Sequence, residues 1–221
     1  MYDIVRSPFY KLLLAGKRLR LPKGQVVQPF GERAMLSLIT SGYVKRYLIT
    51  QEGLKSVQNI YGPNDIFPMT PVFQSIFKMD IYRGPEQYYY ESMTDIEICF
   101  ISLDELETNL ALTPILYKDL LYASGVRLNS YIHRLEDRSL RSGLYRTAHL
   151  LAFLASQFGK PLNVGVEIQL PLTHQEIGEI LDLTRETVSR ELGRLKSRGL
   201  IVPNRKIIIT DMSKLIEIYR K

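Results

Sequence analysis

The segment that most constrains the fold is 173–198, where two helical patterns are joined by a connection too short to form an element of its own. Thr173 suits the N-cap of the first helix, and Glu176 follows it at the spacing of a capping box. Thr184 can cap the second helix. Between them lies Leu181-Asp182-Leu183, and aspartate tolerates the left-handed backbone that a tight turn requires. These signals, in this order, predict a helix-turn-helix.

The second helix, which we expect to end near Arg198, has one apolar side and one polar side. Helical spacing brings Val188, Leu192 and Leu195 together, which predicts that this side is buried. The polar side carries Arg185, Glu186, Ser189 and Arg190. Residues 201–209 then form a pattern typical of a β-hairpin with a basic tip. We therefore expect a winged helix-turn-helix.

The polar side of this helix suits the edges of DNA bases. A major groove admits one helix, arginine can donate two hydrogen bonds to guanine, and glutamate can accept one from a cytosine amine. We expect Arg185, Glu186 and Arg190 to read bases, because they lie near the helix start, which enters the groove in this motif. The side chains expected at the phosphate backbone are Thr173, His174, Gln175, Thr184, Thr187, Arg205 and Lys206. The alternative is a solvated helix with Glu–Arg pairs one turn apart.

Residues 1–114 are expected to form an antiparallel β-barrel or sandwich. Short apolar or alternating runs are separated by turn residues, which is typical of sandwiches and barrels. The expected strands are Gln25–Phe30, Met35–Ile39, Tyr43–Ile49, Lys55–Tyr61, Tyr88–Met93 and Ile96–Ile101. Val72–Met79 can form one short helix. With the helical rear half, the fold class is α+β.

A long helix is expected from Ile115, after Pro114, to about Arg141. Its narrow apolar stripe repeats every seven residues and consists of Tyr117, Leu121, Ser124, Leu128, Tyr131 and Leu135. Such a helix would be about 40 Å long, which is too long for one small barrel to cover. We expect it to pair with a second copy, so that 115–142 forms a dimerisation helix and hinge and 143–221 the DNA-binding domain. A helix packed only on its own barrel is the alternative.

Composition narrows the class of protein further. Residues 1–114 hold 12 Lys and Arg against 12 Asp and Glu, whereas residues 146–221 hold 12 against 8, which favours a polyanionic partner for the rear half. The single cysteine, Cys99, excludes internal disulfides and a cysteine-ligated iron–sulfur cluster; we expect it to be buried in a strand. The low cysteine content favours the cytoplasm. We see no transmembrane segment, secretory leader, catalytic motif or metal-ligand spacing, and expect no membrane partner, enzyme activity or metal site.

The segments Thr173-His174-Gln175-Glu176-Ile177-Gly178-Glu179-Ile180 and Thr184-Arg185-Glu186-Thr187-Val188-Ser189-Arg190 together resemble the DNA-reading motif of the Crp/Fnr transcription regulators. The order of barrel, long helix and helix-turn-helix agrees as well, so the resemblance covers nearly the whole chain. It implies a cyclic-nucleotide-binding-type antiparallel β-barrel of the double-stranded β-helix or jelly-roll type. It also implies a homodimer that binds double-stranded DNA, and contact with RNA polymerase if the protein is an activator.

The resemblance also implies which bases are read. In the catabolite-activator branch of the family, the trio matched by Arg185, Glu186 and Arg190 reads TGTGA-type half-sites. In the Fnr-type branch a Glu–Ser–Arg set reads TTGA-type half-sites, which adds Ser189 to the base-reading residues. This chain has both Arg185 and Ser189, so both half-site types stay open. We expect a palindrome with TGA/TCA cores and half-sites about 34 Å apart.

A cyclic-nucleotide site in this family needs a Gly-Glu pair for the ribose and an arginine with a small hydroxyl residue for the phosphate. Here Pro68-Met69 and Glu86-Gln87 stand at those places, and a carboxylate repels a phosphate. We therefore expect no cAMP or cGMP binding. His133 and His149 are helical imidazoles that haem could use, but we expect neither to be a haem ligand.

An unknown small-molecule effector would have an aromatic region of the barrel available. The candidate pocket residues are Tyr61, Phe67, Tyr82, Tyr88, Tyr89 and Tyr90. The same residue types also build ordinary cores. Two further functions stay open: a constitutive DNA-binding protein whose barrel is only a scaffold, and a small-molecule sensor that acts through protein partners rather than DNA.

Overall fold

The computed structural model describes residues 4–27, 34–79, 88–140, 142–203 and 206–220. The chain divides into two compact units. Unit 1 consists of Met1–Ile49 and Asn59–Ser130, and unit 2 consists of Thr50–Gln58 and Tyr131–Lys221. Among the described residues, no helix combines the length and the apolar character that a membrane crossing requires.

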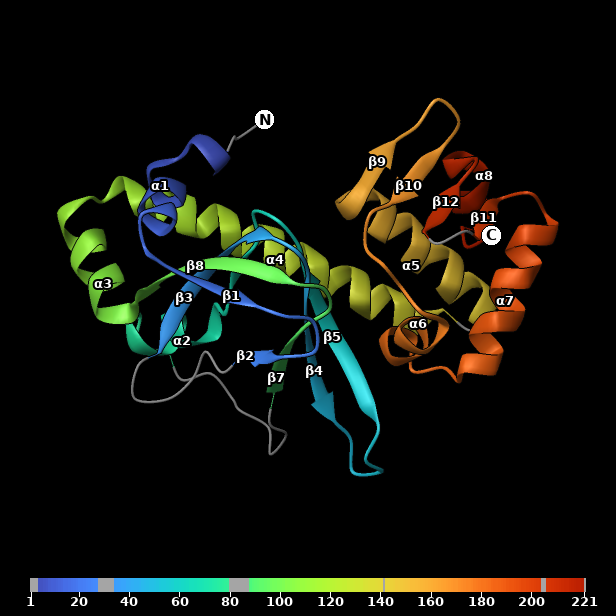
Figure 1. Ribbon diagram of the computed structural model, residues 1–221, viewed down its shortest axis with the longest axis horizontal. Coiled ribbons are helices and arrows are strands. Elements are labelled where there is room, and N and C mark those ends of the chain that lie inside the picture. Colours follow the sequence, from blue (N-terminus) through green and yellow to red (C-terminus); the bar gives the residue numbers. More distant parts are fainter. Residues whose placement is uncertain (1–3, 28–33, 80–87, 141, 204–205, 221) are drawn as a thin grey trace. The chain divides into compact units, whose positions relative to one another are not determined.

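Two four-stranded sheets organise the front of the chain, with strand orders β1-β8-β3-β6 and β2-β7-β4-β5 (Figure 1). The strands are β1 (Lys17–Leu21), β2 (Val26–Val27), β3 (Met35–Ser41), β4 (Val44–Ile49), β5 (Lys55–Tyr61), β6 (Ile66–Phe67), β7 (Tyr88–Ser92) and β8 (Ile96–Ser102). The expected antiparallel jelly-roll type is confirmed, although no pairing among the described strands joins the two sheets into a closed barrel. All six predicted strands are present, and residues 28–33, which include the end of the first, lie outside the described residues.

The helices of the front part are η1 (Ile4–Arg6), α1 (Pro8–Leu14), α2 (Thr70–Ser75), α3 (Leu103–Leu112) and the first part of α4 (Ile115–Ser139). The long helix was expected, and the short helix expected at Val72–Met79 is present but begins two residues earlier and ends at Ser75; α1, α3 and strands β1 and β6 were missed. Both missed helices have a start signal in the sequence. The Ser7 side chain accepts a hydrogen bond from the backbone N–H of Tyr10 (3.2 Å), and Ser102 does the same for Glu105 (3.2 Å).

The interior of unit 1 consists of two apolar clusters. One lies between the sheets and receives residues from both of them: Val27, Ile39, Val44, Tyr61, Phe67, Tyr90, Ile96 and Ile98. The other joins the three helices α1, α3 and α4 to β3, with Phe9, Leu36, Leu106 and Leu120 among its members. Cys99 is fully buried on β8, which confirms the expectation for this residue.

A buried polar network ties α4 to the sheet region of unit 1. Arg127 on α4 donates from Nη2 to Asp65 Oδ1 (2.9 Å) and from Nη1 to Asn59 Oδ1 (3.1 Å), and its guanidinium carbon lies 4.1 Å from the centre of the Tyr61 ring. Burial raises the pKa of the Asp65 carboxyl, and the positive charge of Arg127 opposes this shift. The sequence analysis did not identify this network.

Unit 2 contains a winged helix-turn-helix. Its elements beyond the end of α4 are α5 (Gly143–Phe158), β9 (Gly159–Pro161), β10 (Val166–Ile168), α6 (His174–Leu181), α7 (Arg185–Ser197), β11 (Ile201–Pro203), β12 (Ile207–Ile209) and α8 (Met212–Glu217). The four strands form one sheet in the order β11-β12-β10-β9. The predicted helix-turn-helix and wing hairpin are both present, whereas α8 was missed.

Candidate nucleic-acid interface

The turn between α6 and α7 is held by the residues that predicted it. The Thr173 hydroxyl accepts from the backbone N–H of Glu176 (3.1 Å), and the Glu176 carboxylate accepts from the backbone N–H of Thr173 (2.8 Å), which completes the capping box. Asp182 has φ 52° and ψ 48°, the expected left-handed conformation. Thr184 then caps α7 by accepting from the backbone N–H of Thr187 (3.2 Å). The orientation of α7 against α6 therefore rests on local hydrogen bonds.

Gly178 is a component of this turn that sequence analysis did not single out. Its carbonyl accepts from the backbone N–H of Leu183 (3.0 Å), and a Cβ on Gly178 would lie only 2.6 Å from the Leu183 carbonyl oxygen. Leu183 is held in place by the hydrogen bond from its own N–H, so its carbonyl oxygen cannot move away at low cost. Any larger residue at this position therefore forces α6 and α7 apart.

We predict opposite effects for two glycine-to-alanine changes in this motif. Gly178→Ala is expected to destabilise unit 2 by about 1–3 kcal/mol, because the added methyl group overpacks the turn. Gly193→Ala, on α7 with no atom within 4 Å of the new Cβ, is expected to be neutral or stabilising by up to about 1 kcal/mol, since alanine favours the helix. Unfolding followed by circular dichroism measures both variants, and a stable Gly178→Ala protein would contradict the packing argument.

Helix α7 buries one side and exposes the other, as predicted. Val188, Leu192 and Leu195 are between 0% and 3% exposed, and they hold the helix to its unit. The four predicted base-reading residues, Arg185, Glu186, Ser189 and Arg190, are all exposed. Of the predicted backbone-contacting residues, Thr173, His174, Gln175 and Thr184 are exposed and Thr187 is half-buried. The motif therefore presents all of these side chains except Thr187 freely to solvent.

A buried carboxylate on α7 organises two of its arginines. The Glu191 side chain is only 4% exposed and accepts from Arg190 Nε (3.1 Å) and from Arg194 Nη1 (2.9 Å). It lies against the first turn of α5, with Glu191 Cγ 3.7 Å from the position of a Cβ on Gly143. Glu191 was not among the predicted site residues; its only signal in the sequence is a carboxylate next to one arginine and one turn before another.

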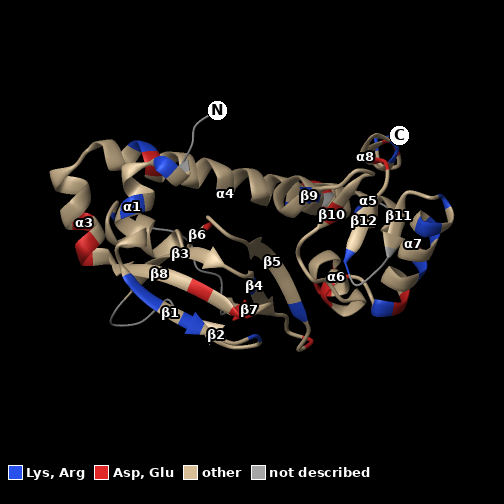
Figure 2. Ribbon diagram, turned by 45° about the horizontal axis from the view of Figure 1, so that its top comes forward, with Lys and Arg blue, Asp and Glu red and all other residues tan. Residues whose placement is uncertain are grey.

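The electrostatic character of α7 is strongly positive. Between Arg185 and Arg198 the sequence has five Lys or Arg residues and two Glu residues, and Glu191 is the buried one. Figure 2 shows Lys and Arg gathered along α7. A positive helix with one buried and paired carboxylate suits a polyanion.

The wing contributes Lys206, which is half-exposed and already has protein partners. Its ammonium group lies 3.2 Å from Glu167 Oε1 and donates to Gln169 Oε1 (2.8 Å). The hydrogen bonds from Lys206 and then from Gln169 lower the pKa of the Glu167 carboxyl. A phosphate contact by Lys206 would therefore compete with Glu167. Arg205 lies outside the described residues.

The apolar stripe expected on α4 is exposed along most of its length. Leu121, Leu128 and Leu135 are 74%, 61% and 69% exposed, and Tyr117 is 42% exposed. Ser124 and Tyr131 are half-buried. Large apolar side chains on one side of a helix rarely stay exposed to this extent without a partner.

The residues of the expected aromatic pocket have a different arrangement. Tyr61, Phe67 and Tyr90 are buried and pack against one another, with ring centres 5.3 to 6.0 Å apart. Tyr88 and Tyr89 are half-buried on β7, and Tyr82 lies outside the described residues. A cavity of about 540 Å³ opens elsewhere in unit 1, lined by residues that include Lys17, Met35, Ser75 and Phe100–Glu105. None of the expected aromatic residues is among its described lining residues.

Comparisons with known proteins agree with this architecture. Residues 145–218 match the model of the Crp-like helix-turn-helix domain. The chain is 27% identical over 196 residues to a CRP-like cAMP-activated global transcriptional regulator of Mycobacterium tuberculosis, covering 88% of this chain and 84% of that protein. It is 26% identical over 197 residues to electron transport regulator A of Shewanella oneidensis, covering 88% and 75%.

Solved structures with the same fold include a CooA mutant from Carboxydothermus hydrogenoformans and FixK2 from Bradyrhizobium japonicum. The first has a TM-score of 0.74 at 22% identity and covers 98% of this chain and 94% of that one. The second also has a TM-score of 0.74, at 19% identity, and covers 92% and 96%. A jelly-roll unit, a long helix and a winged helix-turn-helix with a positive exposed helix define a DNA-binding transcription regulator. Residues 145–218 thus form a Crp-like helix-turn-helix domain, and the chain is similar over most of its length to regulators of the Crp/Fnr type.

Proposed function

We propose that this protein is a cytoplasmic, homodimeric regulator that reads a palindrome with TGA/TCA cores through α7. The observation that carries the proposal is the exposed set Arg185, Glu186, Ser189 and Arg190 on a helix whose opposite side is fully packed. Arginine and glutamate on one helix face can distinguish guanine and cytosine edges in a major groove. A two-fold pair of such helices reads two half-sites about 34 Å apart.

Fluorescence anisotropy with labelled duplexes tests the proposal. The panel contains TGTGA-type and TTGA-type palindromes and a scrambled duplex, at several salt concentrations and without added effector. We expect one palindrome type to bind at least about 1,000-fold more tightly than the scrambled duplex. Equal and strongly salt-dependent binding to all duplexes would mean phosphate contact alone and would contradict base reading. No binding would favour a sensor that acts through protein partners.

The dimer is proposed on the exposed stripe of α4. Burying Leu121, Leu128 and Leu135 against the same side chains of a second copy removes apolar area from water, which the single chain leaves exposed. A parallel pair would relate the two copies by the two-fold symmetry that a palindrome requires.

We predict that Leu128→Glu weakens the dimer by about 100-fold or more, because each pair would bury two unpaired carboxylates. Light scattering coupled to size-exclusion chromatography measures the effect. Asn129→Glu is the matched control, since Asn129 is exposed and lies one position further around the helix, away from the stripe. Dimers of unchanged stability in Leu128→Glu would contradict this interface.

We also propose that cAMP is not the effector, although one relative is named as cAMP-activated. The buried cations among the described residues of unit 1 are Lys45 and Arg127, and each has a carboxylate partner, Glu91 (3.2 Å) or Asp65 (2.9 Å). A buried phosphate needs a cationic or amide-rich cradle that is not already neutralised. Glu86-Gln87, the other part of the sequence argument, lies outside the described residues. Isothermal titration is expected to show no heat of cAMP binding, and micromolar affinity would contradict the proposal.

A further inference from the structure

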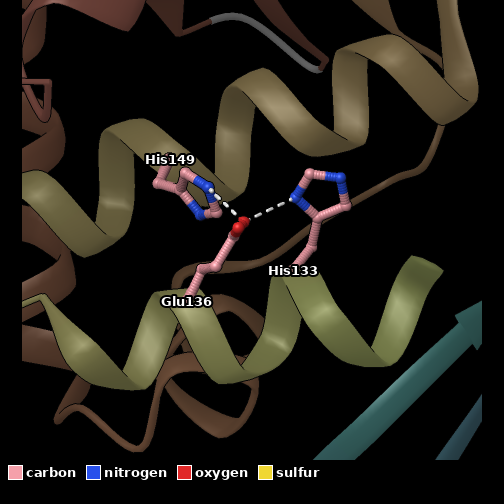
Figure 3. A group of neighbouring side chains, drawn as sticks. All are labelled: His133, Glu136 and His149. Carbon is pink, nitrogen blue, oxygen red and sulfur yellow. Dashed lines mark ion pairs between the residues drawn. The ribbon is translucent and has the colours of Figure 1, made fainter. Parts of the chain in front are cut away.

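Three ligand-type side chains of unit 2 meet where the last turns of α4 face α5 (Figure 3). His133 and Glu136 lie one turn apart on α4, and His149 approaches from α5. Glu136 Oε2 lies 3.0 Å from His133 Nδ1 and 3.6 Å from His149 Nε2. One ligand atom from each residue lies within 4.8 Å of the other two. No metal site was expected, because the sequence has no metal-ligand spacing; His149 comes from a different helix than the other two residues.

These separations suit a single small metal ion. Zinc–ligand distances of about 2.0–2.1 Å at a tetrahedral angle place two ligand atoms about 3.3 Å apart. The separations of Glu136 Oε2 from His133 Nδ1 and from His149 Nε2, 3.0 and 3.6 Å, lie on either side of this value, and the two imidazole nitrogens lie within 4.8 Å of each other. His133 Nδ1 is shielded from solvent and makes no hydrogen bond of normal geometry with the nearby carboxylate. This ion-pair contact, without the alignment of a hydrogen bond, leaves both atoms able to be directed at a third atom.

The surroundings hold both imidazole rings in place. The His133 ring centre lies 4.7 Å from that of Phe153, and the His149 ring meets the Tyr219 ring edge-on at 4.8 Å. The His149 side chain is 10% exposed, whereas Glu136 is 53% exposed. Two ligands are therefore fixed by packing, and the open side at Glu136 admits water as a further ligand.

The donor types and the charge of the cluster also suit a divalent cation. Two imidazoles and one carboxylate provide donors of the types that zinc and related transition metals prefer, and the carboxylate supplies a negative charge for the dication.

We propose that His133, Glu136 and His149 bind a divalent transition-metal ion of the class that prefers imidazole and carboxylate ligands, with Zn²⁺ as the representative ion. A bound ion would join the end of α4 to α5. This site is independent of the DNA-reading function and of the aromatic residues of unit 1.

The test uses the full-length, untagged protein after treatment with a chelator. Zn²⁺ binding is measured by isothermal titration, and Co²⁺ binding by the visible absorption that imidazole coordination produces. We expect one equivalent of Zn²⁺ to bind with micromolar or better affinity. His133→Ala and Glu136→Gln are each expected to weaken binding at least about 10-fold, since even the loss of an outer-shell partner has an effect of that size.

The chain supplies a matched control. His174 is the third histidine, is exposed on α6 and takes no part in the cluster, so His174→Ala is expected to leave Zn²⁺ affinity unchanged. Circular dichroism verifies that each variant is folded, and His133→Gln replaces His133→Ala if the alanine variant is not. Absence of Zn²⁺ binding, equal binding by the cluster variants, or an equal loss in His174→Ala would each overturn the proposal.

Discussion

Replacing Arg190 by alanine is expected to reduce strongly the preference of this regulator for its palindrome while leaving the fold intact. The Arg190 side chain is 66% exposed, and its hydrogen bond to the buried Glu191 uses only Nε. The four Nη hydrogens are then available for a guanine edge, on a guanidinium whose position is fixed by a packed residue. Base reading requires hydrogen-bond donors that are available to the base and a guanidinium that is held in position, and Arg190 has both.

The expected loss of affinity for the specific duplex follows from the number of half-sites. One bidentate base contact contributes about 1–3 kcal/mol of discrimination, and a dimer makes two, so affinity for the specific duplex should fall by about 100-fold or more. Affinity for scrambled DNA should fall much less, because only one phosphate-attracting charge is lost per chain. Anisotropy with both duplexes separates the two effects.

Arg18→Ala is the control for the change in charge. Its side chain is 67% exposed on β1 in unit 1, where it lies 3.7 Å from Glu97. We expect this variant to bind both duplexes nearly as the unaltered protein does. If Arg190→Ala behaved in the same way as Arg18→Ala, α7 would not read bases through Arg190.

Arg127→Met is expected to give the largest loss of stability among single changes in unit 1. The variant leaves Asp65 buried without its cation and removes the hydrogen bond to Asn59 and the contact with the Tyr61 ring. Breaking a buried pair costs about 3–5 kcal/mol; because 22% of the Asp65 side chain is exposed, we expect about 3 kcal/mol. That corresponds to a shift of about 10 °C in Tm, measured by calorimetry, which can resolve separate transitions of the two units.

A double variant and a variant of an exposed ion pair test whether the buried, unpaired charge causes this loss of stability. Arg127→Met with Asp65→Asn should recover at least half of the loss, because no unpaired charge then remains. Arg20→Met breaks an ion pair of similar length, 2.8 Å to Glu97, but Arg20 is 82% exposed, so a loss below about 1 kcal/mol is expected. A loss as large as that of Arg127→Met would contradict the role of burial.

The loss of stability in Arg127→Met is expected to depend on pH, and the direction of this dependence follows from the pKa of Asp65. Burial holds the folded-state pKa of Asp65 above its unfolded value, and loss of the opposing Arg127 charge raises this pKa further. Such a group favours the folded state at low pH and loses that contribution as pH rises through the folded pKa. The Tm difference between Arg127→Met and the unaltered protein should therefore be larger at neutral pH than at mildly acidic pH.

The helix-turn-helix could be predicted from the sequence because its determinants are local. Thr173 bonds to Glu176, Thr184 bonds to Thr187, and Asp182 adopts its left-handed conformation within its own turn. The apolar positions that fix α7 recur at the period of a helix, so they too can be identified without tertiary information. Most of the sheet strands were predicted for the same reason, since alternation and turn residues are short-range patterns.

The sequence by itself therefore determined most of the strands, the long helix, the helix-turn-helix, the class of fold and the face that α7 exposes. Only the tertiary structure decided which polar groups meet: Asp119 accepts from the start of α1 at Phe9 across 110 residues, and Arg127 meets Asp65 across 62. It also brought His149 of α5 to Glu136 of α4, although no local spacing links the two helices. A cap or a periodic stripe is a property of a few consecutive residues, whereas a buried ion pair or a ligand cluster depends on packing between elements, which the order of residues does not reveal.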